Sequence, residues 1–242
     1  MAGEMPEKKE QKPKNPHAGH RGRMRERYVR SGLDAFQDHE ALELLLFYAI
    51  PMRDTNEIAH KMINKMGSLH NLMDASVPDI QRLCGCSEST AILLNLIPAM
   101  WKRYEMNKWE PRSPLDNSKK AAEYAKNLFI GETVECFYLI CLNNQSQLIY
   151  PELLTRGTVN EVHFYSKDIV QAALKHNAAS VIITHNHPSG YLKPSMEDQA
   201  ATEAIVTALA TIGVDVIDHI VIAGNKYLSF SEKRLYDFEG RY

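Results

Sequence analysis

Apolar residues follow two different patterns in the two halves of the chain. Between Asp38 and Asn107 they recur every three or four positions, as in HEALELLLFYAI at 39–50, which is the spacing of one helix face. Beyond residue 134 they form short, nearly continuous runs such as VECFYLICL, typical of strands buried on both faces. We therefore expect an N-terminal all-α helical bundle and a C-terminal α/β domain with a mixed sheet flanked by helices.

The pattern also predicts individual elements. In the first half, Ser68 and Ser76 are expected to cap short helices, and a last helix over 91–104 is expected to kink or end early at Pro98. In the second half we expect helices at 119–130, 166–177 and 195–211, and strands at 134–142, 147–154, 158–164, 179–185, 214–224 and 226–230.

Composition divides the chain into four parts. Residues 1–16 are rich in Lys, Glu and Pro and are expected to form a disordered basic tail. Residues 17–110 form the expected helical domain. WEPRSPLDNS, at 109–118, has two prolines and little apolar content, which predicts a linker over 111–118. The α/β domain would then span 119–242.

Overall composition excludes several classes of protein. The chain has 242 residues, 44% of them hydrophobic, which is enough for a core and unlike a wholly disordered chain. No apolar run approaches the roughly 20 residues of a transmembrane helix, and the N-terminus lacks the apolar segment of a secretory signal. Four cysteines are too few for a disulfide framework in a chain of this length. We expect a cytoplasmic protein without a membrane partner.

Charge is balanced overall but not locally. The formal net charge is −2, yet residues 1–30 hold nine Lys or Arg and four Glu. Part of this excess lies in the tail, where solvated charge is the ordinary explanation. Arg23, Arg27 and Arg30 have the spacing of one helix face, and such a face could contact DNA phosphates non-specifically.

Candidate chemistry is concentrated in THNHPSGYLKPSMED, at 184–198. His185 and His187 are two positions apart at the end of an expected strand, so their side chains point to the same side. Asp198 lies in the first turn of the expected helix after Ser195. Alone, the histidine pair could be incidental and Ser195 with Asp198 an ordinary helix cap. Together, two imidazoles and a carboxylate form the three-ligand set of a catalytic zinc site with one open position.

The combined spacing is similar to a known signature. His-x-His-Pro, six residues, Ser, two residues and Asp match the signature of JAMM (MPN-plus) zinc metalloproteases at every defined position. HNHPSG and PSxxD resemble most closely the bacterial RadC family, as do the N-terminal stretches GHRGRMRERY, DHEALELLLFYAI and RDTNEIAHKM. The resemblance covers about residues 17–237.

The resemblance implies a role for each residue of the signature. His185, His187 and Asp198 would bind one zinc ion per chain, and Ser195 would help to stabilise the oxyanion. The signature also requires a general-base glutamate at the start of a strand. Glu135 fits that place, and Glu152 on the next strand is the competing candidate.

Three further motifs are less specific. The segment from Ile80 to Ala91 resembles a helix-hairpin-helix motif with the turn Gly85-Cys86-Ser87, in which serine replaces the second glycine. Such a motif could contact DNA, contact another protein or have a purely structural role, and all three stay open. Asp218 and His219 could orient a metal ligand or form part of the core. None of the four cysteines has the spacing of a metal ligand, which argues against a zinc nucleobase deaminase.

We therefore expect a JAMM-type zinc hydrolase that cleaves an amide or isopeptide bond in a protein or peptide substrate. The alternative is a DNA-binding factor associated with repair or recombination, either a metal-dependent nuclease or a protein with a non-catalytic metal site. One aspartate and two histidines favour zinc over the carboxylate-rich sites of two-metal nucleases.

Overall fold

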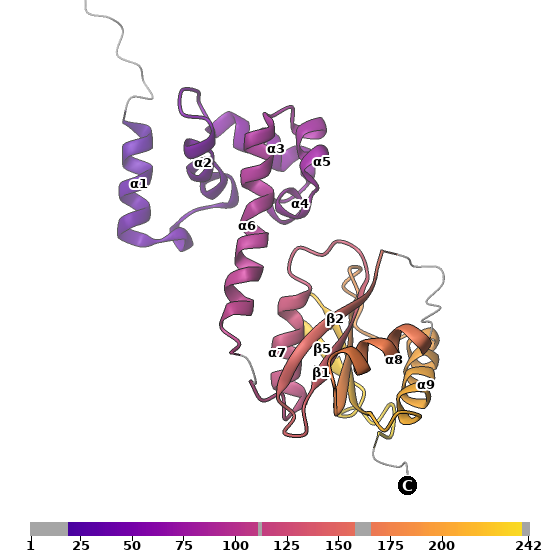
Figure 1. Cartoon of the computed structure of the whole chain (residues 1–242). Coiled ribbons are helices and arrows are strands. Elements are labelled where there is room, and N and C mark those ends of the chain that lie inside the picture. Colours follow the sequence, from indigo (N-terminus) through magenta and orange to yellow (C-terminus); the bar gives the residue numbers. More distant parts are fainter. Residues whose placement is uncertain (1–18, 111–112, 158–165, 239–242) are drawn as a thin grey trace, which may run out of the picture. The chain divides into compact units, whose positions relative to one another are not determined.

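The structure, a computed structural model, describes residues 19–110, 113–157 and 166–238 (Figure 1). The expected tail at 1–16 and the expected strand at 158–164 lie outside these residues. The chain forms two compact units, Met1–Leu96 and Ile97–Tyr242. Among the described residues, no helix combines the length and apolar character needed to cross a bilayer.

The first unit is all-α, as predicted. Its elements are α1 (His20–Ser31), a 3-10 turn η1 (Leu33–Ala35), α2 (Asp38–Ala49), α3 (Asn56–Met66), α4 (Leu69–Asp74), α5 (Val77–Cys84) and the first part of α6 (Glu88–Asn107). Ser68 and Ser76 cap α4 and α5 by accepting backbone N–H bonds, as expected. The apolar faces of α2 to α6 enclose a core that includes Leu42, Leu46, Met62, Leu72, Ile80 and Leu94. Met24 of α1 packs with Leu44 and Phe47 in a second, smaller cluster.

The arginines of α1 do not form the free basic face that their spacing suggested. Arg27 bonds both oxygens of Glu40, at 2.7 and 3.0 Å, and its guanidinium lies over the ring of Phe36. Arg23 and Arg30 are exposed. A charge already paired within the fold is a poor phosphate ligand, so Arg27 is a weaker candidate for a phosphate contact than Arg23 or Arg30.

The segment that resembles a helix-hairpin-helix consists of α5, a three-residue turn and α6. Gly85 ends α5 in the left-handed conformation, with φ 66° and ψ 32°, which favours glycine. Ser87 caps α6, because its Oγ accepts a 3.3 Å hydrogen bond from the backbone N–H of Thr90. Pro98 does not end α6, which continues to Asn107.

The second unit is a five-stranded mixed sheet in the order β2-β1-β3-β4-β5. The parallel pair β3–β4 lies between antiparallel neighbours on both sides. The strands are β1 (Cys136–Leu142), β2 (Leu148–Arg156), β3 (Ser180–Asn186), β4 (Asp215–Ala223) and β5 (Lys226–Ser229), and the helices are α7 (Ser118–Leu128), α8 (Ser166–Lys175) and α9 (Met196–Ala210).

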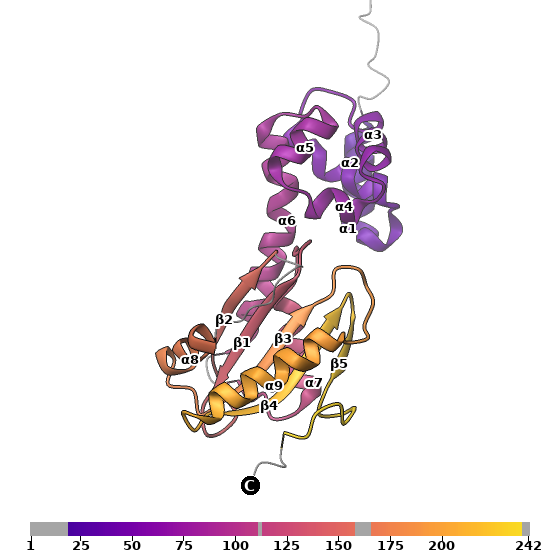
Figure 2. The same ribbon diagram turned by 90° about the vertical axis from the view of Figure 1, so that its right-hand side faces the viewer.

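Helices cover both faces of this sheet (Figure 2). Helix α7 packs on one face against Tyr138, Ile140 and Ile182, whereas α8 and α9 pack on the other face against Leu139 and Ile183. Alternate residues of β1 therefore enter different cores, which explains why its sequence is apolar at every position. The predicted class, a helical region followed by a mixed sheet flanked by helices, is confirmed.

The compact units divide at Leu96 and Ile97, whereas composition placed a linker at 111–118. The later part of α6 belongs to the sheet unit, and its Lys102 forms a 3.0 Å ion pair with Glu132. Just after the helix, Trp109 packs on Tyr124, with ring centroids 5.3 Å apart. Leu115 is 1% exposed, and its backbone N–H bonds the carbonyl of Ser146 at 2.8 Å. Among the described residues 113–117 of this proline-rich stretch there is no helix and no strand, yet Leu115 is packed in the core.

Candidate metal centre

Three predicted ligands converge at the end of β3. His185 lies in the strand and pairs with Phe137 of β1 on one side and Val221 of β4 on the other. His187 follows two positions later and points to the same side, with its Nε2 2.9 Å from His185 Nε2. Asp198 faces both rings from the first turn of α9.

The spacing of their donor atoms fits a small cation. Asp198 Oδ1 lies 3.2 Å from His185 Nε2, and Asp198 Oδ2 lies 3.6 Å from His187 Nε2. In a tetrahedral zinc site with bonds of about 2.0–2.1 Å, neighbouring ligand atoms lie about 3.3 Å apart. The three side chains therefore have nearly the separation that zinc requires.

The hydrogen bond of His187 shows which of its nitrogens is free. Its Nδ1 lies 2.6 Å from the backbone carbonyl oxygen of Tyr191, which can only accept a hydrogen bond. The proton of a neutral His187 ring is therefore on Nδ1, and the lone pair is on Nε2, facing Asp198. This is the tautomer that a metal ligand needs.

Electrostatics favour neutral and anionic ligands at this site. Burial lowers the pKa of His185 to about 4, against a smaller opposing effect of Asp198. Burial alone would raise the pKa of Asp198, but hydrogen bonding from His187 and the charge of His185 hold it well below its usual range. Asp198 raises the pKa of His187, because its carboxylate can accept a hydrogen bond from the protonated ring, and burial of the ring opposes this effect.

Glu135 lies beside the three ligands, immediately before β1. One atom from each of Glu135, His185, His187 and Asp198 lies within 4.8 Å of the others, the one such group of four among the described residues. Burial raises the pKa of Glu135, and the charge of Asp198 adds to this while His187 opposes it. Glu135 therefore lies close enough to the candidate ligands to act on a water molecule bound between them, which stays a prediction.

Glu152, the competing candidate, is engaged elsewhere. It lies on β2 and forms ion pairs with Lys175 Nζ at 2.8 Å and His176 Nε2 at 2.7 Å. Hydrogen bonds from Lys175 and His176 lower its pKa, so it is a weaker base than Glu135. The structure therefore brings Glu135, not Glu152, to the histidines.

Ser195 is the N-cap of α9 and also touches a ligand. Its Oγ accepts a 3.1 Å bond from the backbone N–H of Asp198 and donates a 2.8 Å bond to Asp198 Oδ2. The same hydroxyl of Ser195 therefore caps the helix and contacts the carboxylate of Asp198. Ser195 and His187 also line a cavity of about 620 Å³ together with Tyr191 and Met196, which leaves space for a substrate next to the ligands.

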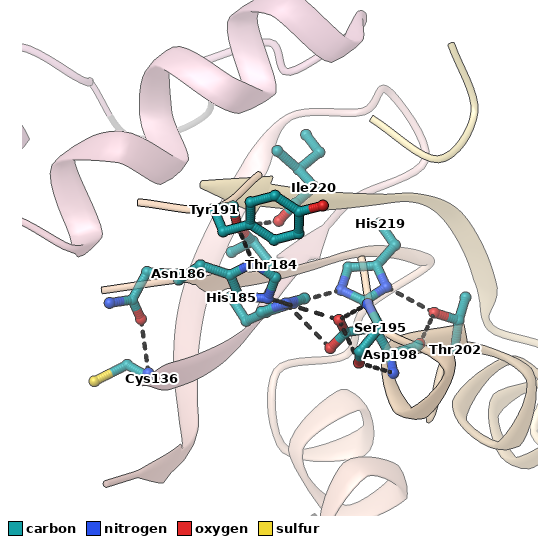
Figure 3. Close-up of polar contacts among 11 residues, drawn as sticks. Cys136, Thr184, His185, Asn186, Tyr191, Ser195, Asp198, Thr202, His219 and Ile220 are labelled. Carbon is teal, nitrogen blue, oxygen red and sulfur yellow. Dashed lines mark hydrogen bonds and ion pairs between the residues drawn. The ribbon is translucent and has the colours of Figure 1, made fainter. Parts of the chain in front are cut away.

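Two side chains behind the ligands complete the site (Figure 3). His219 Nε2 lies 2.8 Å from His185 Nδ1, and its Nδ1 lies 2.6 Å from Thr202 Oγ1. Asp218 accepts from the hydroxyls of Ser118 and Ser229 instead. Of the suggested pair, His219 therefore contacts a candidate ligand and Asp218 does not, because adjacent residues of a strand face opposite sides. Sequence reasoning missed Thr202, which no motif distinguishes from other helix threonines.

The part of the chain that holds these residues is similar in sequence to known proteins. Residues 115–235 match the family model described as the RadC-like JAB domain. The chain is 35% identical to a UPF0758 protein of Fusobacterium nucleatum over 224 residues, which cover 90% of this chain and 97% of the relative. It is 34% identical to a UPF0758 protein of Pseudoalteromonas translucida over 214 residues, covering 88% and 95% of the two chains.

Proposed function

The chain belongs to the RadC-like JAB domain family, and on this basis we propose that it is a zinc-dependent hydrolase. Its substrate would be an amide or isopeptide bond in a protein or peptide. The observation that carries the proposal is the convergence of two imidazole nitrogens and a carboxylate at 2.9–3.6 Å, with a second carboxylate beside them.

His185, His187 and Asp198 would hold one zinc ion per chain and leave a fourth position open. When bound, zinc supplies Lewis acidity, which lowers the pKa of a water molecule to roughly 7 and polarises a carbonyl. The donor set suits this role, because one carboxylate and two neutral imidazoles leave the cation a net positive charge.

Glu135 would act as the general base and then the general acid. Its partly buried carboxylate has a raised pKa, and a base whose pKa is nearer to the operating pH transfers protons more effectively. It would take a proton from the attacking water and deliver it to the leaving amine, so that one water and one amide give one carboxylate and one amine. The single proton of the Ser195 hydroxyl, which is directed to Asp198 Oδ2, would turn toward the oxygen of the tetrahedral intermediate and stabilise its charge.

The alternative role in DNA binding has weaker support. Arg27 is paired with Glu40, and the Ser87 side chain already occupies one of the backbone N–H groups at the start of α6. An N–H that is used by a cap is not available to a phosphate. Of the three arginines that share one face of α1 by their spacing, Arg23 and Arg30 are exposed and remain candidates.

The proposal is tested by screening the purified protein against peptides, isopeptide-linked peptides and DNA, each with and without a chelator. We expect chelator-sensitive hydrolysis of a peptide or isopeptide bond that Glu135→Gln abolishes. Glu152→Gln is the matched control, since Glu152 lies on the neighbouring strand and should be dispensable. Metal-dependent cleavage of DNA alone, or activity that depends on Glu152 rather than Glu135, would contradict the proposal.

A further inference from the structure

We propose that His219 and Thr202 are positioning residues that hold His185 in the tautomer needed to bind zinc. The inference rests on the proposed function, because it assigns a purpose to side chains behind the candidate ligands. Three hydrogen bonds link them in one chain (Figure 3). They join His185 Nδ1 to His219 Nε2 at 2.8 Å, His219 Nδ1 to Thr202 Oγ1 at 2.6 Å, and Thr202 Oγ1 to the backbone carbonyl oxygen of Asp198 at 2.6 Å.

The carbonyl oxygen of Asp198 determines which atom is the donor in each of these three hydrogen bonds. A carbonyl oxygen can only accept, so the single hydroxyl proton of Thr202 is directed toward Asp198. Thr202 must then accept from His219 Nδ1, which places a proton on that nitrogen. The opposite direction would leave two oxygen acceptors 2.6 Å apart with no proton between them.

Burial determines the state of the other ring nitrogen of His219. The side chain is 0% exposed, and the aromatic rings of Phe137 and Phe230 lie 5.9 and 4.5 Å from it. Because burial disfavours the charged imidazolium, the His219 ring is neutral. Its one ring proton is on Nδ1, and its Nε2 carries a lone pair. That lone pair accepts from His185 Nδ1, so His185 presents an unprotonated Nε2 to Asp198 and the metal position.

In both candidate histidine ligands a hydrogen bond from Nδ1 leaves Nε2 unprotonated, but the acceptor of that bond differs. His187 donates its Nδ1 proton directly to the carbonyl of Tyr191. His185 is too deeply buried to reach a loop carbonyl and instead uses His219 and Thr202 to reach Asp198, itself a ligand. Strands β3 and β4 and helix α9 are thereby connected through the site, which restrains the ring of one ligand relative to the carboxylate of another.

Zinc affinity tests this assignment when it is measured by competition with a chromophoric chelator. Thr202→Val keeps the shape of the side chain but leaves the His219 Nδ1 proton without an acceptor, and we expect affinity to fall about 10–100-fold. Thr202→Ser keeps the hydroxyl and should restore affinity to within about threefold of the wild type. His219→Leu should weaken zinc binding at least as much as Thr202→Val.

Thr184→Val is the matched control for buried hydroxyl loss. Thr184 is also 0% exposed, and its hydroxyl donates a 2.8 Å hydrogen bond to the backbone carbonyl of Ile220. Unlike Thr202, it is not one of the residues that link His185 to Asp198 by hydrogen bonds. We expect Thr184→Val to lower the midpoint temperature of thermal unfolding without changing zinc affinity. Equal losses of affinity in Thr184→Val and Thr202→Val would overturn the assignment, because they would indicate general destabilisation.

Nitrogen-15 spectra of the histidine rings in the zinc-free protein give an independent readout. We expect His185 and His219 both to be neutral and protonated on Nδ1, with the His185 signal changing in Thr202→Val and not in Thr202→Ser. A proton on His219 Nε2 would overturn the inference even if zinc binds. A wild-type protein that binds no zinc would instead refute the proposed function, whereas the tautomers would still be decided by the spectra.

Discussion

The side chain of Asn186, which lies between the two histidines, holds the backbone on both sides of Glu135. Its Oδ1 accepts a 2.7 Å hydrogen bond from the backbone N–H of Cys136, and its Nδ2 donates a 3.0 Å bond to the carbonyl of Val134. The His-x-His segment therefore carries two ligands on one side of the strand and positions the proposed base with the residue between them.

Replacement of Asn186 should separate base positioning from metal binding. In Asn186→Ala the backbone next to Glu135 loses both hydrogen bonds, and a displacement of about 1 Å at a catalytic group can cost on the order of 10²-fold in rate. We expect hydrolysis to fall by about 10–100-fold while zinc content stays at the wild-type level. Steady-state kinetics and metal analysis of the same sample check this.

Asn143→Ala is the control for this prediction. Asn143 fixes the turn at the other end of β1 by accepting from the backbone N–H groups of Gln145 and Gln147, far along the strand from Glu135. It should lower stability with little effect on the rate. If the two asparagine variants reduce the rate equally, Asn186 has no specific effect on the base.

The grouping of the candidate ligands could be predicted from sequence, because their spacing along the chain indicates it directly. His185 and His187 share a face by strand periodicity, and Ser195 with Asp198 marks a helix start, so local rules place all four. The contacts of Asn186 with β1 and of His219 with Thr202 and His185 join segments 17 to 52 residues apart. No local rule specifies such pairs, and the choice of Glu135 over Glu152 likewise needed the strand register.

Arg27 shows the same limit in the helical unit. Its spacing with Arg23 and Arg30 was consistent with a phosphate-binding face, but spacing does not reveal which cation lies next to a carboxylate of another helix. The packing next to the proline-rich stretch was unpredictable for a related reason, since partly buried Trp109 and buried Leu115 contact residues distant in sequence.

Ser195 variants should distinguish its hydroxyl from its role as a helix cap. Ser195→Ala removes both and should cost about 1 kcal/mol of stability and roughly 10²-fold in rate. Ser195→Asn keeps a capping side chain without the hydroxyl, so stability should recover while the rate stays low. Calorimetry and kinetics check this; a rate that recovers in Ser195→Asn would mean that only the cap matters.

The Arg27–Glu40 ion pair should stabilise the protein in a pH-dependent manner. Hydrogen bonding by Arg27 lowers the pKa of Glu40 from 4.5 to about 2. Since the folded pKa is below the unfolded one, the stabilisation is complete above about pH 4.5 and is lost as the pH falls toward 2. A double-mutant cycle with Arg27→Met and Glu40→Gln, measured by thermal unfolding, should show coupling at pH 7 that decreases by pH 2.5.

Arg23→Met and Arg30→Met provide the comparison for that cycle. Both arginines are exposed, so neither should alter unfolding at either pH. Coupling between Arg27 and Glu40 that is absent at pH 7 would show that Arg27 is free, and it would restore Arg27 as a candidate phosphate contact.

The sheet unit should need the later part of α6 for full stability. A fragment that starts at Ile97 keeps the Trp109 ring against Tyr124 and the 3.0 Å ion pair of Lys102 with Glu132. A fragment that starts at Leu115 loses both contacts. We expect the longer fragment to unfold at a higher temperature and to bind zinc; equal thermal midpoints would place the boundary at the proline-rich stretch instead.

The most direct test of the central claim is the zinc content of the purified protein, measured by mass spectrometry of the metal against protein concentration. We predict about one zinc per chain in the wild type and in Glu135→Gln, and a strong loss in His185→Ala, in Asp198→Ala and in the double variant of His185 and His187. Full retention of zinc in the double histidine variant would contradict the assignment of this site.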